Sequence, residues 1–245
     1  MADKQNIFYT SISNHYSEIF PFNPAQLRFV EAKVGSMAGK KILDIGCATG
    51  ELAYNLADSG ASVTGIDLNE DLLKQAQVNK VQPNACFQKG NMLDIEKDFS
   101  DIRFDAVLCF GNTLVHLNTL NDVIKMLKGV RAILKPQGVF LLQILNYDYI
   151  LADEVKTLPR IETENITFLR NYQFHKTDEY IDFETELIIK HKALNIHNET
   201  RLLALKSRDL QKALNEAGFT KIEFYANFNQ EAFGGKHLPL VVSCC

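Results

Sequence analysis

The sequence predicts an α/β fold in which helices cover both faces of a mostly parallel sheet. Up to Asn146, short apolar runs alternate with helix-type segments, and fully apolar strands are typical of a sheet buried on both faces. The run that ends at Ile45 is followed by the glycine turn Gly46–Gly50, and the next run ends in Asp67. A glycine turn after one strand and an acid after the next is the basic pattern of nucleoside-binding α/β proteins.

Local patterns define the elements of this sheet. Apolar residues at three- and four-residue spacing predict helices within the first 36 residues, the second of them over Ala25–Ser36. The turn Lys135–Gly138 should separate a helix from the strand after it, because Pro136 cannot continue a helix. The expected strands are Lys40–Cys47, Ser62–Asp67, Ala85–Lys89, Phe104–Phe110 and Val139–Leu145, and the helices between them are Glu51–Asp58, Glu70–Asn79 and Leu120–Leu134.

The pattern changes after Asn146. A helix over Asp148–Thr157 precedes long segments rich in Ile, Phe and Thr, which predict an antiparallel meander. Its strands are expected at Ile166–Tyr172, Tyr180–Lys190 and Lys192–Leu205, with polar turns at Lys176–Glu179 and Ile196–Glu199. A helix at Ser207–Ala217 and strands at Thr220–Phe228 and Leu238–Cys244 then complete a seven-stranded sheet in which only the last strand is antiparallel.

The chain therefore divides into three parts. Residues 1–36 form an N-terminal helical lid, residues 37–147 and 206–245 form the core with the main sheet, and residues 148–205 form a small antiparallel cap inserted after the fifth strand. We expect the lid and the cap to roof the ligand site at the carboxyl edge of the sheet.

Composition excludes several classes of protein. The net charge of −4 gives no electrostatic reason to expect nucleic acid, which binds basic surfaces. No apolar run is long enough to cross a membrane, and the N-terminus lacks the apolar core of a signal peptide. The five cysteines are scattered and odd in number, which argues against a disulfide framework. We expect a cytoplasmic protein, and no metal site, because His175, His191 and His197 lack a shared ligand spacing.

The turn and several later segments jointly resemble class I S-adenosylmethionine-dependent methyltransferases. Asp44-Ile-Gly-Cys-Ala-Thr-Gly50 is similar to the family motif D-x-G-x-G-x-G, with Ala48 in place of the middle glycine. Further similar segments are Asp67, Gly90–Leu93, Phe104–Asn112, Lys135–Val139 and Ala217–Phe219, so that the resemblance covers roughly residues 37–146 and 206–245. It implies a Rossmann-like sheet with S-adenosylmethionine as cofactor and S-adenosylhomocysteine as product.

Two finer likenesses concern the acceptor side. Gly111–Leu117 is locally similar to a segment of glycine and sarcosine N-methyltransferases. The aromatic N-terminus, with Tyr9, Tyr16 and Phe20, resembles the helical lid of small-molecule methyltransferases. Because the first likeness is local, it does not identify the substrate.

The resemblance assigns cofactor contacts to residues whose chemistry suits them. Asp67 suits the ribose, because a carboxylate accepts two hydroxyl hydrogen bonds at once; the alternative is that it only caps a helix. Asp44 either anchors the amino group of the cofactor through water or bonds to loop amides. Ala48 tolerates its position if its φ is negative, and cofactor binding should weaken if the turn requires a positive φ. The full expected set is Tyr16, Asp44, Gly46, Cys47, Ala48, Gly50, Asp67, Leu68, Asn91, Met92, Leu93, Phe110, Gly111 and Asn112.

Catalysis needs little from the protein beyond alignment, since the sulfonium is already a good leaving group. A base is needed only if the nucleophile arrives protonated. The candidate catalytic residues are His116 and Tyr9, each with a purely structural role as the alternative. The candidate acceptor contacts are Asn146, Tyr147, Arg170 and Arg201; for the two arginines the alternative is a solvated surface position.

These observations predict methyl transfer from S-adenosylmethionine to an N or O atom of a small molecule, by in-line displacement. They leave open whether the protein forms a homodimer. One alternative is a non-catalytic module that only binds the cofactor. A nicotinamide-dependent oxidoreductase is disfavoured, because the dinucleotide fingerprint is G-x-G-x-x-G and the turn at Gly46–Gly50 has a different spacing.

Overall fold

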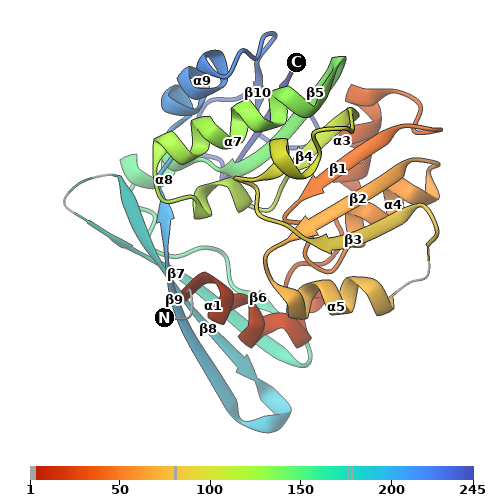
Figure 1. The fold of residues 1–245 in the computed structure, drawn as a ribbon. Helices are drawn as coiled ribbons and strands as arrows, with labels where there is room; N and C mark the ends of the chain where they lie inside the picture. The colour runs from red at the N-terminus through yellow and green to blue at the C-terminus, as the bar shows by residue number, and fades with distance from the viewer. Residues whose placement is uncertain (1–3, 80–81, 176, 178) are drawn as a thin grey trace.

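The computed structural model describes residues 4–79, 82–175, 177 and 179–245, and this part of the chain forms two sheets (Figure 1). The larger sheet has seven strands in the order β10-β11-β5-β4-β1-β2-β3. Only β11 runs antiparallel to its neighbours, which confirms the expected mixed sheet. The strands are β1 (Lys41–Ile45), β2 (Ser62–Asp67), β3 (Ala85–Lys89), β4 (Phe104–Cys109), β5 (Leu134–Leu145), β10 (Glu223–Tyr225) and β11 (Pro239–Cys244).

Helices pack on both faces of this sheet, because successive strand residues point to opposite sides. Leu43 of β1 belongs to the apolar core beneath α7 (Leu120–Ile133) and α9 (Ser207–Glu216), whereas its neighbour Ile42 belongs to the core beneath α3 (Pro24–Val34) and α4 (Glu51–Asp58). Both side chains are fully buried. The other helices between α3 and α9 are α5 (Glu70–Asn79), α6 (Ile95–Asp98) and α8 (Tyr147–Ala152).

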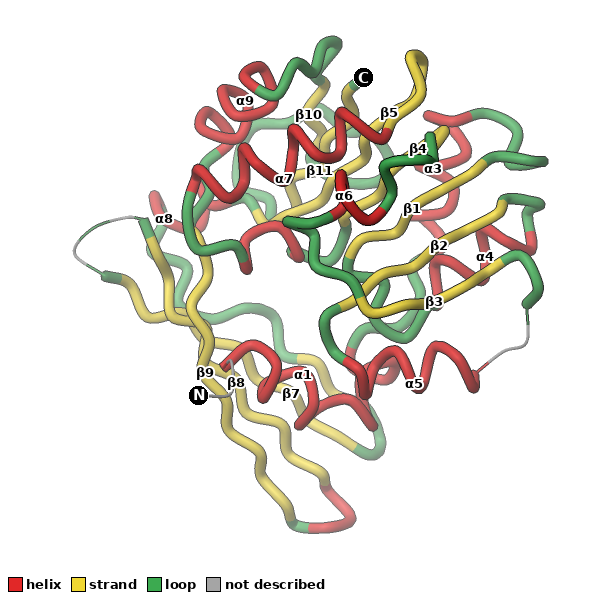
Figure 2. Tube along the Cα trace, in the orientation of Figure 1, coloured by secondary structure: helices red, strands yellow, loops and turns green. Residues whose placement is uncertain are grey.

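The second sheet lies beside the carboxyl ends of the main strands and forms the cap. Its four antiparallel strands are β6 (Ile161–Glu162), β7 (Ile166–Phe174), β8 (Tyr180–Ile189) and β9 (Leu194–Leu203). The N-terminal helices α1 (Lys4–Ile12) and α2 (Tyr16–Ile19) pack on it through a small apolar core that joins Phe8, Ile12 and Ile19 to Phe168 and Leu187. Figure 2 shows α1 lying between this sheet and α5.

Polar contacts hold α1 to both neighbours. Asn69, at the start of α5, donates to the side chain of Asn6 and to the hydroxyl of Thr10. On the cap side, Asn198 donates to the hydroxyl of Ser11 over 3.0 Å. The first helix therefore bridges the main sheet and the cap, directly over the edge where a ligand is expected.

The structure corrects several expected bounds in and near the core. The strand β5 starts at Leu134, directly after α7, so the turn Lys135–Gly138 lies inside it. The reason is that Leu134 pairs with Phe104 before the register shifts ahead of Val139. The helix expected over Asp148–Thr157 is the shorter α8, and β10 is shorter than the predicted strand Thr220–Phe228.

Two corrections concern the cap. Ile196–Glu199 is not a turn but lies inside β9, where its four residues pair with Glu184–Leu187 of β8. The chain reverses instead at the short 3-10 helix η3 (Lys190–Lys192), followed by Ala193 with a φ of 47°. The strand β6 was not expected, being two residues long. Lys176 and Asp178 of the predicted turn Lys176–Glu179 lie outside the described residues.

Candidate active site

A cavity of about 440 Å³ opens where the carboxyl ends of the main strands meet α1, α2 and the cap. A smaller cavity of about 60 Å³ adjoins it on the side of β2. The larger one is lined by the glycine turn, the loop after β4, the N-terminal helices and the inner face of the cap. Residues that line both are Tyr9, Tyr16, Gly46, Ala48, Phe110, Gly111 and His116. The two cavities are thus parts of one site divided at these residues.

The glycine turn needs glycine at two positions. Gly46 and Gly50 have φ values of 75° and 79°, in the left-handed region that disfavours a Cβ atom. A Cβ atom on Gly46 would lie 2.5 Å from Oγ1 of Thr113, and one on Gly50 would lie 2.6 Å from Cζ of Phe87. Both glycines therefore let neighbouring side chains close against the backbone of the turn.

Ala48, in the middle of the same turn, has a φ of 48°. The condition for an unstrained alanine, a negative φ, is therefore not met. Its amide nevertheless donates to Oδ2 of Asp67 over 3.0 Å, which ties the turn after β1 to the end of β2. The departure from the glycine motif is accommodated by a left-handed alanine, a conformation that costs about 1–2 kcal/mol for a residue with a Cβ.

Asp67 accepts a second amide, from Asn69, over 2.9 Å at its other oxygen. Burial raises the pKa of this carboxyl, and the amide hydrogen bonds oppose that rise. An ionised carboxylate has about four lone-pair sites, so each oxygen can still accept a hydroxyl. The carboxylate lines the smaller cavity beside Leu68 and Met92. Asp67 can therefore hold the amide at the start of α5 and still accept the two hydroxyls of a ribose.

Asp44, at the end of β1, lines the larger cavity and is buried. Burial raises its pKa to about 7, and the charge of Asp67 contributes in the same direction. A cation bound beside Asp44 would therefore shift it towards its ionised form. The neighbouring Cys47 is also buried, and burial raises the pKa of its thiol, which keeps it protonated and unreactive.

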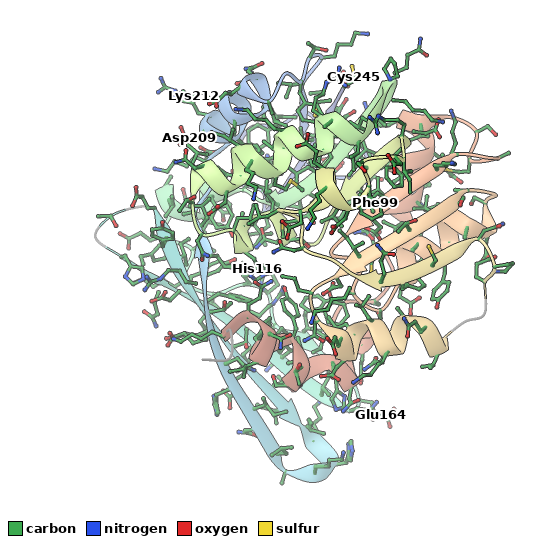
Figure 3. The ribbon with its side chains drawn as sticks, viewed as in Figure 1. Phe99, His116, Glu164, Asp209, Lys212 and Cys245 are labelled. Atoms are coloured by element: carbon green, nitrogen blue, oxygen red, sulfur yellow. The ribbon has the colours of Figure 1, made fainter. Side chains whose placement is uncertain are left out.

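Tyr9 and His116 meet at the boundary of the two cavities. The tyrosine hydroxyl lies 2.9 Å from Nε2 of His116, and the rings pack edge to face. His116 ends the 3-10 helix η2 (Thr113–His116) behind β4, and Figure 3 shows it between the main sheet and the cap. Burial raises the pKa of Tyr9, and Asp67 adds to the rise, so the hydroxyl stays protonated at neutral pH. Tyr16 behaves in the same way.

Two residues that were expected to contact the acceptor lie behind the cavity lining instead. Tyr147 is fully buried, and its hydroxyl accepts from Nδ2 of Asn112 over 3.1 Å. Asn146 caps α8 by accepting from the amide of Tyr149, and its Nδ2 donates to the carbonyl of His237. Both side chains are occupied in fixing the end of β5. Neither lines the cavity, so a direct contact with a small ligand there is not supported.

Asn112 does line the larger cavity, but its polar atoms are already bonded. Its Oδ1 accepts the amide of Leu145 over 2.9 Å, and its φ is 66°. Asn91 is similar: its Oδ1 accepts the amide of Leu93, and on that loop it is Gly90 and Met92 that line the smaller cavity. In both asparagines the side chain shapes a loop, and the loop backbone or a neighbour faces the ligand space.

The two arginines of the cap lie in different surroundings. Arg170 of β7 lines the larger cavity. Arg201 of β9 is exposed, pairs with Asp182 over 3.1 Å and lies over the ring of Tyr180. Arg201 therefore takes the solvated surface position that was the alternative for it, because its strand position points it to the outer face of the cap.

Sequence reasoning missed part of the cavity wall. Tyr172, Phe183 and Leu202 line it from three successive cap strands, and Gln143 lines it from β5 while its Oε1 accepts the amide of Gly111 over 2.9 Å. Alternation of buried and exposed positions along each strand marks these residues as inward-facing. Only the pairing of the strands, however, shows that they surround the same space.

Comparison with known proteins identifies this arrangement. A family model described as "Methyltransferase domain" matches residues 36–218, which span strands β1 to β5 of the main sheet, the cap and α9. This chain belongs to that methyltransferase family. It is an S-adenosylmethionine-dependent methyltransferase, and the residues around the glycine turn fit that cofactor through the two conformationally required glycines and the lone-pair capacity of Asp67.

One similar protein covers nearly the whole methyltransferase, and another covers about half of it. A protein of Geobacillus sp. (strain WCH70), whose name says methyltransferase but gives no substrate, is 30% identical over 91% of this chain and 94% of its own length. A ubiquinone biosynthesis O-methyltransferase of Haemophilus ducreyi (strain 35000HP / ATCC 700724) is 29% identical, over only 54% of this chain and 56% of the relative.

Solved structures share the fold. An S-adenosylmethionine-dependent methyltransferase from Clostridium acetobutylicum ATCC 824 superposes with a TM-score of 0.81, covering 96% of this chain and 98% of that one at 16% identity. The sugar N-methyltransferase KedS8 from Streptoalloteichus sp. ATCC 53650 gives a TM-score of 0.63 at 16% identity, covering 89% of this chain and 85% of that one.

The described residues lack two features. Within residues 4–79, 82–175, 177 and 179–245, no helix is both long and apolar enough to cross a membrane. The same part of the chain holds no group of three or more His, Cys, Asp or Glu side chains arranged to bind a metal ion.

Proposed function

We propose that this methyltransferase transfers the methyl group of S-adenosylmethionine to an N or O atom of a small-molecule acceptor, by in-line displacement. The observation that carries the proposal is the pair of adjoining cavities that share Tyr9, Gly46, Gly111 and His116 as a common wall. A cavity of about 440 Å³ is in the range of pockets that enclose small ligands. Its roof of lid and cap favours a metabolite over a polymer.

The donor is proposed to lie along the carboxyl edge of β1, β2 and β4. Asp67 accepts the ribose hydroxyls, while Gly90 and Met92 of the smaller cavity pack against the adenine. The buried Asp44 faces the amino group, whose positive charge favours the ionised carboxylate. When bound, the cofactor supplies an electrophilic methyl group on a good leaving group. The residues of this chain hold and orient the reactants around it.

Tyr9 and His116 are proposed to act at the reacting centre, since both belong to the shared wall. An amine or hydroxyl acceptor that arrives protonated needs a base, and the imidazole of His116 is of the type that takes a proton near neutral pH. Tyr9 keeps its proton, because burial and Asp67 raise its pKa. Its hydroxyl therefore fixes the orientation of the imidazole through the 2.9 Å contact with Nε2.

Relatives support both atom types. One relative is named as an O-methyltransferase and one similar fold as a sugar N-methyltransferase. It stays a prediction that Gly111–Leu117 is locally similar to glycine and sarcosine N-methyltransferases. It also stays a prediction that the protein does not bind nucleic acid. The carboxyl-edge site and the roofed cavity support an acceptor held beside the loop that carries His116.

The proposal is tested with trideuteromethyl-labelled S-adenosylmethionine and a fractionated metabolite extract. Mass spectrometry should detect a labelled small molecule with the wild-type protein but not in the same extract without protein, and Asp67→Ala should form less of it at a limiting donor concentration. The site of the label then shows whether N or O is methylated. Stoichiometric binding of the cofactor, with label transferred to no small molecule of the extract, would contradict the proposal and favour a module that only binds the cofactor.

A further inference from the structure

Strand β7 carries a charged residue where its pattern calls for an apolar one. Ile166, Phe168, Arg170 and Tyr172 share one face of this strand, because they are two residues apart. The three neighbours of the arginine on this face are buried, with at most 2% of their surface exposed. This face lines the larger cavity at Arg170 and Tyr172. An arginine therefore lies among buried side chains in the wall of the proposed acceptor space.

The guanidinium group of Arg170 is incompletely bonded. One terminal nitrogen donates to the carbonyl of Pro159 over 2.7 Å. Its Nε is buried and has no hydrogen-bond partner in the described part of the chain. Of the ion pairs found among the described residues, none involves Arg170, in contrast to Arg201 and Asp182. A buried donor without a partner costs free energy. Arg170 as a whole is of intermediate exposure, so its positive charge is partly removed from water and has no counter-ion within the described residues.

A second buried polar group lies next to it. Thr185 of β8 is the direct cross-strand partner of Arg170. Its side chain is 4% exposed, and its Oγ1 lacks a hydrogen-bond partner among the described residues. Directly paired residues of an antiparallel sheet hold their Cβ atoms about 4.5–5.5 Å apart. Two adjacent strands thus each present an unsatisfied polar group on the face that borders the cavity.

We propose that Arg170 binds a carboxylate of the methyl acceptor, so that the acceptor is a small carboxylic acid bearing an N or O nucleophile. This rests on the proposed function, which it makes more specific. A carboxylate matches the planar fork of a guanidinium and supplies the negative charge that the cavity wall lacks at this position. The chemistry selects a carboxylate over a neutral amide, which has no charge to offer.

The donor also carries a carboxylate, and the two sources must be distinguished. The amino-acid end of the donor is proposed to lie at Asp44 and the glycine turn, on the main sheet. Arg170 projects from the cap, the opposite wall of the cavity, which favours the acceptor as the source. Donor affinity is therefore expected to be unchanged within about twofold when Arg170 is replaced.

The test is calorimetry on the protein saturated with S-adenosylhomocysteine, so that no turnover is needed. The probes are matched pairs of a carboxylate and its amide: acetate and acetamide, hexanoate and hexanamide, benzoate and benzamide. At least one carboxylate should bind tenfold or more tightly than its amide. Arg170→Met should remove that preference, and Arg170→Lys should retain part of it. The matched control, Arg201→Met on the outer face of the cap, should leave it unchanged.

Each contrary result has a defined meaning. Equal binding of every pair to the wild-type protein overturns the proposal, as does an Arg170→Met variant that keeps the preference. A Met variant that loses donor affinity while its melting temperature is unchanged assigns the guanidinium to the donor instead. If Arg170→Met does not fold, Thr185→Val and Arg170→Lys test the same subsite. A carboxylate affinity that is unaltered in both of these variants also overturns the proposal. Failure of the methyl-transfer screen with an intact carboxylate preference counts against the proposed function alone.

Discussion

The hydroxyl of Tyr9 lies 2.9 Å from Nε2 of His116, across 107 positions of sequence. The contact joins α1, at the start of the chain, to the 3-10 helix that follows β4. Each residue comes from an element with its own neighbours: α1 is held by Asn69 and Asn198, and η2 packs against β5 and β9. The lid helix and the loop of the main sheet therefore meet at the boundary between the two cavities.

Removing the hydroxyl of Tyr9 should lower turnover without displacing the donor. Tyr9→Phe keeps the ring contact with His116 but loses its hydrogen bond, so we expect kcat to fall about tenfold or more, with donor affinity nearly unchanged. His116→Ala should cost on the order of 100-fold in kcat if the imidazole acts as a base. Steady-state kinetics and calorimetry measure the two effects separately.

A suitable control for that experiment is Tyr180→Phe. Tyr180 donates from its hydroxyl to the carbonyl of Asn118 over 2.9 Å, at the rim of the cap rather than in the cavity wall. It should leave kcat unchanged. Full activity of His116→Ala across the pH range would remove this residue as the base.

Removing the carboxylate of Asp67 should weaken donor binding more than it lowers the free energy of unfolding. Asp67→Ala is expected to weaken S-adenosylmethionine binding by about 1–3 kcal/mol, the range for deleting a hydrogen bond to a charged group. Calorimetry gives the affinity, and denaturant unfolding gives the accompanying loss from the amides of Ala48 and Asn69. The exposed Asp98 of α6 provides a matched Asp→Ala control. Unchanged donor affinity in Asp67→Ala would rule out the ribose role.

Asp44 should make both stability and donor binding depend on pH. Burial raises its pKa to about 7, above the ordinary 3.8. Between these two pH values the folded protein therefore holds a proton that the unfolded chain has released. Its contribution to stability is therefore present below about pH 4 and lost as pH rises through about 7, at most about 4 kcal/mol. Unfolding curves of the ligand-free protein between pH 4 and 7 should show this loss relative to Asp44→Asn.

Donor affinity should change in the opposite direction. The ammonium group of the cofactor favours the ionised form of Asp44, so affinity should rise between pH 6 and 7.5 by up to roughly eightfold for a carboxyl of this pKa. Calorimetry at several pH values measures the rise, and Asp44→Asn should flatten it. A wild-type affinity that is constant over this range would show that Asp44 is already ionised or does not sense the donor.

Much of the main sheet could be predicted from the sequence, because each element there has a strong local pattern. The bounds expected for α4, β2, α5 and β3 are those observed. The placement of Asp67 at the ligand edge follows from its position at the end of β2, which needs only the order of the strands. The sign of φ at Ala48 could not be predicted, since it depends on how the turn packs against its neighbours.

The side-chain orientations in the cap were harder to predict, because they depend on how its strands pair. Arg170 and Arg201 both lie on strands with mixed polar and apolar residues, and only the antiparallel register decides which face each one takes. Asn146 and Tyr147 follow β5 at the ligand edge, as predicted. They nevertheless turn into the packing behind the cavity, because the capping of α8 and the contact with Asn112 bind them there.

The left-handed Ala48 predicts that a glycine at this position stabilises the protein. Relief of the strain at φ 48° is worth about 1–2 kcal/mol, and the greater freedom of glycine in the unfolded chain offsets about 0.5–1 kcal/mol of it. Ala48→Gly should therefore raise the free energy of unfolding by about 0.5–1 kcal/mol in denaturant titrations. Ala32→Gly, at an exposed position of α3, should lower it by about 1 kcal/mol instead. Destabilisation by both substitutions would show that the turn carries no strain at Ala48.

Asn69 predicts how the lid is held. Its Oδ1 accepts the amide of Leu72, and its Nδ2 donates to Asn6 and Thr10 of α1. Asn69→Asp keeps the acceptor that caps α5 and removes both donors, so α5 should stay intact while α1 loosens. We expect faster hydrogen exchange in α1 than in α5 and faster release of S-adenosylmethionine in stopped-flow measurements. The melting temperature should fall as well, because the new carboxyl is buried beside Asp67. Asn69→Ala removes the cap as well and should lower the melting temperature. If donor release from the Asp variant is as slow as from the wild type, α1 does not gate the site, because the tether it shares with α5 will have been removed without consequence.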